Sequence, residues 1–279
     1  MSVWESAILG AVQGLTEFLP VSSSGHLEIA GALFGLRDPE SNLWMTVTLH
    51  LATVLASIVV FRREIWAIIR GTLRLTFNDQ SLYFLNIVIS IVPILLVGLL
   101  FKDWIEALFS GNLILVGAML VVTAVLLAFS HFARIGTRPI TPKRAFVIGI
   151  AQAIAVLPGL SRSGATISAA LLQGVRREEA ARFSFLMVII PILGMNLLDV
   201  VHAMKGSGAV ATTGEAALGG AAGDMGLVAV AVGFVVAFLT GLFACKVMIR
   251  LVSRGKLLWF AVYCVAAGLV AIILGLTGV

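Results

Sequence analysis

The chain has 279 residues, of which 60% are hydrophobic and only 12% are charged, and its formal net charge is +5. A soluble domain is about half apolar and about a quarter charged, so this composition excludes an ordinary soluble protein and indicates a membrane protein. The apolar runs approach about twenty residues without alternating, which predicts an all-α polytopic membrane protein rather than a β-barrel.

The first predicted element, residues 1–35, is an apolar segment interrupted by Pro20 and by the serines Ser22, Ser23 and Ser24. Each side of the break has about fifteen residues, which is too short to span a hydrocarbon core of about 30 Å. Irregular backbone at membrane depth must be buried in protein or line a wet cavity. We therefore predict two half-helices that form a re-entrant hairpin.

Six full spans and a second broken segment follow in the sequence. Three spans are predicted at residues 44–61, 82–101 and 113–130, with an amphipathic interfacial segment at 61–81. A second re-entrant hairpin is predicted at residues 144–174, interrupted at 158–164. Three more spans are predicted at residues 183–201, 226–248 and 257–276, with a flexible Gly/Ala/Thr-rich loop at 205–223.

The two broken segments resemble each other, residues 10–27 against residues 149–166. The matched pairs are Gly10 and Gly149, Gln13 and Gln152, Ser22 and Ser161, Ser24 and Ser163, and Gly25 and Gly164. Each half of the chain then holds one hairpin and three spans. Because three is odd, the second half enters from the opposite side, which predicts an inverted-topology repeat. We expect one membrane domain, residues 1–279, with repeats at about 1–131 and 140–279.

Positive charge is concentrated on one predicted side of the membrane. The other side holds only Arg37, Lys102 and Lys205, and Arg162 lies inside the second break. The remaining fifteen cations are Arg62, Arg63, Arg70, Arg74, Arg134, Arg138, Lys143, Arg144, Arg176, Arg177, Arg182, Lys246, Arg250, Arg254 and Lys256. This bias marks the cytoplasmic side, so both termini and the first hairpin face outward. It also accounts for the net charge without a nucleic-acid partner.

The turns of the two hairpins, here called the tips, are expected to meet near the membrane midplane. A half-helix begins after each tip, at about Ser24 and Ser163, so free N–H groups and the positive dipole end point into the meeting place. Serine is also a favoured cap at such a position. Together with Arg162, these groups predict a site for an anion, phosphate above all.

The repeats differ at three positions that carry chemistry. Arg162 stands where the first half has Ser23, Val156 stands opposite Glu17, and Ala165 stands opposite His26. Fixed positive charge in one half and proton-transfer groups in the other suit phosphoryl transfer. Glu17 lies one helical turn after Gln13, and we expect it to accept a proton from a serine or from water. We interpret His50 as a structural hydrogen-bonding residue, with lining of the site as the alternative. We interpret Asp199 as a structural or cavity-lining residue rather than a catalytic one.

Both broken segments resemble signatures of a known family, the undecaprenyl pyrophosphate phosphatases of the bacitracin-resistance type. The matching stretches are QGLTEFLPVSSSGH at residues 13–26 and LPGLSRSGATIS at residues 157–168. The first signature, a Glu or Gln four residues before a Glu, is matched by Gln13 and Glu17. The second signature is matched by Pro158, Gly159, Ser161, Arg162, Ser163 and Thr166. The chain length and the segment FSFLM at 183–187 also fit, so the resemblance covers essentially the whole chain.

The resemblance implies an integral membrane enzyme that removes the terminal phosphate from a C55 isoprenyl pyrophosphate. It implies that Ser23 is the nucleophile, Glu17 its activator, Arg162 the phosphate clamp and His26 a supporting acid or base. The remaining candidate substrate-binding residues are Gln13, Ser22, Ser24, Gly25, Ser161, Ser163, Gly164 and Thr166. Members use Mg²⁺ or Ca²⁺, and Glu17 is the candidate metal ligand. Gln13 stands where many members have Glu, so we also consider a cation held largely by the substrate's own oxygens.

The sequence therefore predicts a phosphatase of the bacterial plasma membrane that recycles the cell-wall lipid carrier and confers bacitracin resistance. The expected partners are membrane lipid, the C55 isoprenyl pyrophosphate and, as a further partner to test, a second copy of the chain in a homodimer. The alternative is a secondary transporter or lipid flippase, because broken helices in inverted repeats are typical of that class. The discriminating feature is the Ser–Glu pair confined to one repeat, which a transporter does not need.

Overall fold

The computed structural model describes residues 1–35, 39–74, 76, 78–101, 104–105, 108, 111–133, 136–206 and 226–278, with side chains described except at 39–44 and 195–206. Within these residues the secondary structure is helical, apart from one isolated β-bridge between Arg138 and Val175. The prediction of an all-α protein is confirmed. The predicted loop at 205–223 lies outside the described residues, except for 205–206, which end a helix.

Four helices are long and apolar enough to cross a membrane: α5 (Asp79–Leu100), α7 (Leu113–His131), α12 (Leu227–Ser253) and α13 (Leu257–Thr277). A fifth candidate joins the described part of α3 (Pro39–Val60) to α4 (Arg62–Leu73) across a 74° bend. The chain is thus a multi-pass membrane protein. The span expected at 183–201 falls in α10 (Arg177–Gly206), and as a membrane span it stays a prediction because its last residues have no described side chains.

The bend before α4 agrees with the interfacial segment expected there. Ile68 of α4 is buried, whereas Trp66 is exposed with the Arg70 guanidinium 5.2 Å from its ring centroid. An amphipathic helix with a cationic, tryptophan-bearing face is typical of the membrane–water interface.

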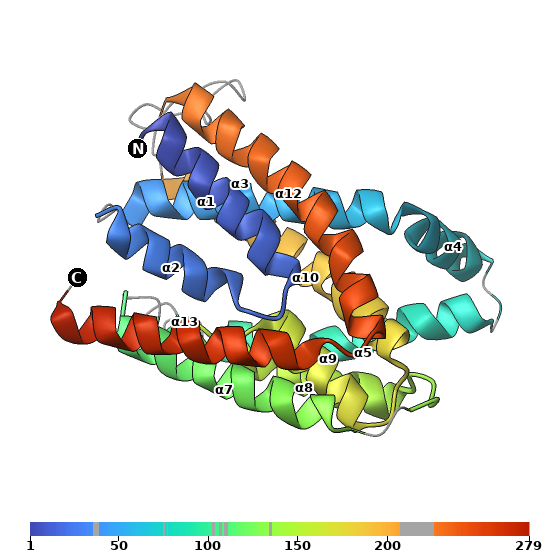
Figure 1. Cartoon of the computed structure of the whole chain (residues 1–279). Coiled ribbons are helices and arrows are strands. Elements are labelled where there is room, and N and C mark those ends of the chain that lie inside the picture. The colour runs from blue at the N-terminus through green and yellow to red at the C-terminus, as the bar shows by residue number, and fades with distance from the viewer. Residues whose placement is uncertain are drawn as a thin grey trace.

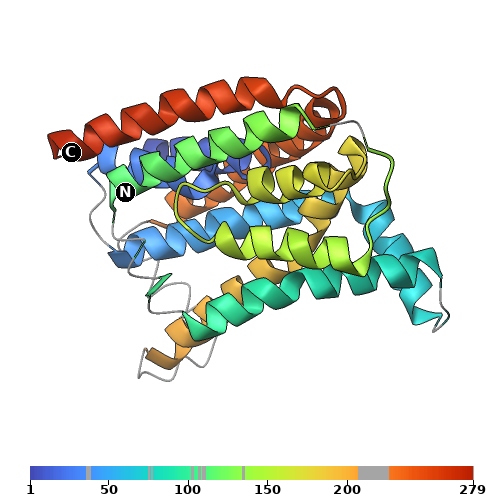
Figure 2. The same cartoon turned by 90° about the horizontal axis from the view of Figure 1, so that it is seen from below.

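Each broken segment forms a pair of short helices, α1 (Val3–Phe18) with α2 (Ser23–Leu33) and α8 (Pro142–Ile154) with α9 (Arg162–Leu172). Figures 1 and 2 show both chain termini at one end of the molecule, with the first hairpin open toward that end and the second open toward the other. The tips therefore approach each other inside the helix bundle. That the two halves are inverted in a membrane stays a prediction.

Close helix packing at glycines fixes these hairpins between the spans. α1 packs along α12, and α8 packs along α5. A Cβ on Gly10 would lie 2.4 Å from the Gly233 carbonyl oxygen, and one on Gly149 would lie 2.3 Å from the Ser90 carbonyl oxygen. Small residues that let backbones approach are the usual helix contacts in membranes. Each hairpin thus leans on a span of the other half of the chain, which holds the two tips in register.

Candidate active site

Serine caps begin both of the helices that leave the tips. Ser22 Oγ accepts the Gly25 N–H at 3.3 Å, and Ser161 Oγ accepts the Gly164 N–H at 3.0 Å. Ser22 is the one non-glycine residue with positive φ, at 69°, in the described part of the chain. Strained backbone of this kind persists where the surroundings impose it, often at functional sites. The expectation of a serine cap at each tip is confirmed, and the caps lie two residues before the expected Ser24 and Ser163.

The two tips are bonded to each other and to their neighbours. Ser163 Oγ donates to the Leu19 carbonyl oxygen of the first tip at 3.2 Å. The Ser161 N–H donates to Thr123 Oγ1 of α7 at 3.0 Å. Hydroxyl pairs of nearly equal length occur in both tips, Ser22 with Ser24 at 3.3 Å and Ser161 with Ser163 at 3.2 Å.

A cavity of about 20 Å³, here called the serine cavity, lies between the tips. Its lining is Thr16, Glu17, Ser22, Ser23, Ser24, Ala155, Leu160, Ser161, Arg162 and Ser163. Both helix N-termini open beside it, so it offers hydroxyls, dipoles and one guanidinium to an anion. The structure therefore brings together most of the residues that the sequence selected from segments far apart in the chain.

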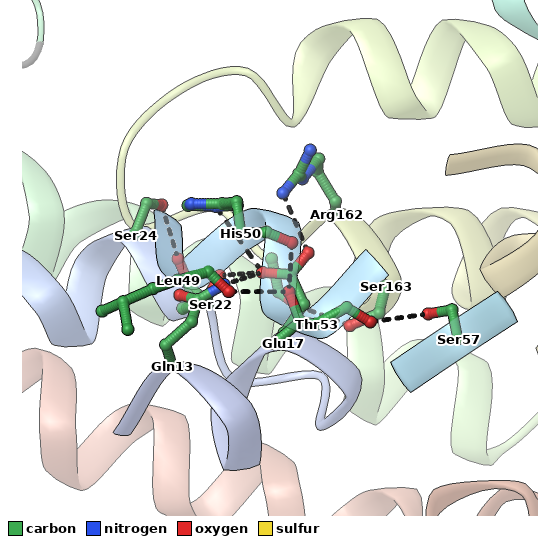
Figure 3. A network of polar contacts seen from close by, with 12 residues as sticks. Gln13, Glu17, Ser22, Ser24, Leu49, His50, Thr53, Ser57, Arg162 and Ser163 are labelled. Atoms are coloured by element: carbon green, nitrogen blue, oxygen red, sulfur yellow. Dashed lines mark hydrogen bonds and ion pairs between the residues drawn. The ribbon is translucent and has the colours of Figure 1, made fainter. Parts of the chain in front are cut away.

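Glu17 is the centre of the polar network (Figure 3). It stands at the end of α1 with its side chain 8% exposed. Oε1 accepts a hydrogen bond from Arg162 Nη2 at 2.9 Å. Oε2 accepts from Ser23 Oγ at 2.6 Å and from Gln13 Nε2 at 2.9 Å. A carboxylate that already holds the serine hydroxyl is placed to take its proton.

His26 lies away from this network. Its Nδ1 is 2.8 Å from the Ser22 carbonyl oxygen, which can only accept, so Nδ1 carries a proton. Its Nε2 is 2.8 Å from the hydroxyl of Tyr263 in α13, whose ring stacks on the imidazole. His26 therefore holds the start of α2 against α13, and Tyr263 is a partner that the sequence did not suggest.

Four other predicted residues do not line the serine cavity, and one of them, Gln13, instead contacts Glu17. Gly25 and Gly164 have their N–H groups committed to the serine caps. Gly25 also lets the tips touch, because a Cβ there would lie 3.1 Å from Gly159 Cα. Thr166 donates to the Arg162 carbonyl oxygen at 2.8 Å and shares a hydrogen bond with Ser184 of α10. Their direct contact with substrate stays a prediction.

From α3 the sequence suggested only His50 for the site, as an alternative to a structural role, and the structure brings one face of this helix beside Glu17. His50 Nε2 lies 3.8 Å from Glu17 Oε2, while its Nδ1 is 2.8 Å from the Thr46 carbonyl oxygen. Thr53 and Ser57 follow at helical spacing and line a second cavity beside Glu17. The interpretation of His50 as structural was therefore incomplete. The signal was the polar spacing of His50, Thr53 and Ser57 in an apolar helix. The side chain of Asp199 lies outside the described residues.

The described residues do not form a protein-built metal centre. They contain no group of three or more His, Cys, Asp or Glu residues that could hold an ion. Both carboxylate oxygens of Glu17 already have hydrogen-bond partners. Glu17 as a metal ligand therefore stays a prediction from the sequence, and no catalytic step is assigned to a metal here.

The family model described as bacitracin resistance protein BacA matches residues 6–270. The chain belongs to the BacA family. A protein of Bacteroides thetaiotaomicron named undecaprenyl-diphosphatase is 50% identical over 274 residues, covering 98% of this chain and 99% of the relative. One of the same name from Parabacteroides distasonis is 50% identical over 273 residues, covering 98% of each. One from Carboxydothermus hydrogenoformans is 38% identical over 282 residues, covering 100% of this chain and 99% of the relative.

The region matched by the BacA model includes both tips and every residue that lines the serine cavity. The resemblance noted in the two signatures is thereby confirmed. The relatives carry the name of an enzyme over the whole chain length, so the similarity favours the phosphatase over the transporter alternative.

Proposed function

We propose that this BacA-family chain hydrolyses undecaprenyl pyrophosphate to undecaprenyl phosphate and inorganic phosphate. This reaction returns the lipid carrier to cell-wall synthesis, and we expect it to confer bacitracin resistance, as the description of the family model suggests. The observation that carries the proposal is the Ser23–Glu17–Arg162 cluster in a cavity between two helix N-termini. The names of the relatives supply the identity of the substrate.

Ser23 is the proposed nucleophile. Its Oγ attacks the terminal phosphorus while Glu17 takes the hydroxyl proton, and a serine–phosphate bond forms. The bond from that phosphorus to the bridging oxygen breaks, and the bridging oxygen keeps the electron pair and leaves as part of the lipid monophosphate. Water then attacks the phosphoserine, inorganic phosphate departs, and the serine hydroxyl is restored.

Arg162 is the proposed phosphate clamp. Only one of its N–H groups is needed for Glu17, so the rest of the planar guanidinium can bind phosphate oxygens in a bidentate manner. Ser24 and Ser163, with the dipoles of α2 and α9, add further stabilisation of the negative charge. Positioning and charge stabilisation of this kind supply most of the rate in phosphoryl transfer.

A divalent cation, Mg²⁺ or Ca²⁺, is proposed to enter with the substrate. The pyrophosphate oxygens themselves are the ligands, since Mg²⁺ commonly takes most of its ligands from phosphates and water. When bound, it would reduce the negative charge of the pyrophosphate. Removal of divalent cations with a chelator is expected to reduce phosphate release, and added Mg²⁺ or Ca²⁺ to restore it.

The proposed location is the bacterial plasma membrane, with the serine cavity open to the outer side and the two repeats inverted. The charge bias of the loops supports this orientation. A homodimer, the further partner that the sequence left open, is part of the proposal. Crosslinking of the protein in native membranes, read by gel mobility, tests for the dimer.

The deciding experiment is phosphate release from a long-chain isoprenyl pyrophosphate by detergent-purified protein. If the protein is a phosphatase, we expect multiple turnovers from the wild type and none from the variant in which both Ser23 and Glu17 are replaced. A transporter or flippase would bind the lipid without releasing phosphate, and that result would reject the proposal.

A further inference from the structure

A second cavity, here called the glutamine cavity, adjoins the serine cavity and has a volume of about 20 Å³, which is enough for a water molecule. Glu17, Arg162 and Ser163 line both cavities. The other polar lining residues of the glutamine cavity are Thr53, Ser57, Gln152, Thr166 and Ser184. The reaction proposed above uses none of these five side chains, although the cavity touches its catalytic carboxylate.

Gln152 has no hydrogen-bond partner among the described residues for either amide atom, although it is only 1% exposed. Its counterpart in the first half, Gln13, donates to Glu17 four residues later. The residue four positions after Gln152 is Val156, whose side chain cannot accept a hydrogen bond. A buried amide without a hydrogen-bond partner lowers the stability of the folded protein. The amide of Gln152 therefore indicates a bound molecule in the cavity that it lines.

The hydrogen-bond donors and acceptors that line the cavity indicate which molecule can bind there. Thr53 Oγ1 donates to the His50 carbonyl oxygen at 2.9 Å, and Ser57 Oγ donates to the Thr53 carbonyl oxygen at 3.2 Å. Thr166 is committed in the same way to a carbonyl of its own helix. These hydroxyls therefore offer lone pairs rather than protons. Arg162 also lines the serine cavity, and apart from it the Gln152 amide is the donor left among these side chains. One amide gives too few donors for a phosphate, whereas water both donates to the lone pairs and accepts from the Gln152 amide.

The proposed reaction also needs a route for a proton. Each turnover places on Glu17 a proton taken from Ser23 or from water, and the carboxylate must lose it before the next proton is accepted. Pyrophosphate fills the serine cavity during this step, so the free approach to Glu17 is through the glutamine cavity. His50 and Arg162 are the other ionisable groups beside Glu17.

We propose that the glutamine cavity holds ordered water that receives the proton from Glu17, with Gln152 fixing the position of that water. The inference rests on the proposed function, and it applies to attack by Ser23 and to direct attack by water alike. Gln152 acts through water and does not touch the reacting phosphorus, so it is a positioning residue.

The test is steady-state phosphate release by Gln152→Met, which keeps the length of the side chain and removes both polar atoms. We expect kcat to fall about tenfold or more with KM within about twofold of wild type, and the solvent deuterium isotope effect on kcat to rise. Gln173→Met is the matched control. Gln173 follows the C-terminal end of α9, away from the tip. Its amide donates to the Ala169 carbonyl oxygen, and it lines neither cavity.

Thr53→Val carries the same test if Gln152→Met does not purify, because it removes one water-facing hydroxyl at nearly constant shape. A rise in KM at constant kcat would make Gln152 a substrate contact and overturn the relay. Unchanged kinetics, or a loss of kcat without a larger isotope effect, would overturn it as well. If wild-type protein released no phosphate, the proposed function itself would fail, which is a separate outcome in the same assay.

Discussion

At the scale of single residues, Glu17 joins the two halves of the chain. One carboxylate oxygen holds Ser23 of the first tip, and the other holds Arg162 of the second. Ser23 and Arg162 occupy equivalent first positions of α2 and α9, after the caps Ser22 and Ser161. In the proposed mechanism, the asymmetry between these two positions gives the site a nucleophile on one side and a cation on the other.

Replacement of Ser23 by alanine is expected to lower phosphate release by several orders of magnitude, because it removes the attacking oxygen. Glu17→Gln should resemble it, because an amide cannot accept the proton. Ser22→Ala and Ser24→Ala lose hydrogen bonds only, each worth about 1.5–3 kcal/mol when the partner is charged, or roughly 10- to 150-fold. Turnover of the four purified variants at saturating lipid substrate is the measurement.

The nucleophile assignment has a clear contrary result. If Ser23→Ala retained a tenth or more of wild-type turnover, attack by serine would be excluded. Direct attack by water activated at Glu17 would then explain the reaction, and the hydrogen bond between Ser23 and Glu17 would serve only to orient the carboxylate.

Arg162→Lys is expected to lower kcat/KM at least about tenfold, while the protein still inserts and purifies normally. Lysine keeps the charge but loses the planar fork that reaches Glu17 and phosphate oxygens together. Size-exclusion profiles check folding, and phosphate release checks function. Near-wild-type kcat/KM in this variant would remove Arg162 from the phosphate site.

At the scale of helices and turns, Gly159 fixes how the second tip meets α7. Its φ is +90°, and a Cβ there would lie 2.2 Å from the Val116 carbonyl oxygen. Neither the backbone conformation nor the space admits a side chain. The tip therefore depends on this glycine for its position beside the serine cavity.

Gly159→Ala is expected to destabilise the protein by about 2 kcal/mol or more and to reduce activity, because the backbone at the tip must move. Gly31→Ala is the control, since Gly31 lies within α2 and a Cβ there has no atom within 4 Å. That change should stabilise by about 0.5–1 kcal/mol. Thermal unfolding in detergent measures both, and equal midpoints for the two variants would contradict the assignment.

At the scale of the whole molecule, the orientation of the helices in the membrane is the main prediction. Single cysteines at exposed Pro139 and Arg254 should react from the cytoplasm, and those at Trp104 and Leu227 from outside. The two native cysteines, Cys245 and Cys264, are fully buried and should stay silent. Labelling of Pro139→Cys and Leu227→Cys from the same side would refute the inverted repeat. Between them the repeat predicts a re-entrant hairpin, which returns to the side it entered from, and a single crossing at residues 183–201.

The sequence by itself determined the membrane class, the broken helices and the identity of most residues around the serine cavity. Length and hydropathy suffice for the class, because a span needs about twenty apolar residues. The breaks are visible because proline together with a nearby cluster of serines disfavours a continuous apolar helix. The two signatures then paired Glu17 and Ser23 with Arg162, although these residues lie far apart in the chain.

Only the tertiary structure decided which polar side chains share a cavity. Histidine is a common catalytic residue type, yet the ring of His26 forms a hydrogen bond with Tyr263 of α13, which is distant in the sequence. His50 looked structural, yet packing of α3 places it 3.8 Å from Glu17. Gln152 and its counterpart Gln13 are the same residue type at equivalent positions of the two repeats. Gln13 donates to Glu17, whereas the amide of Gln152 has no partner among the described residues. Hydrogen-bond partners depend on contacts between elements that the chain brings together on folding, and local sequence does not encode those contacts.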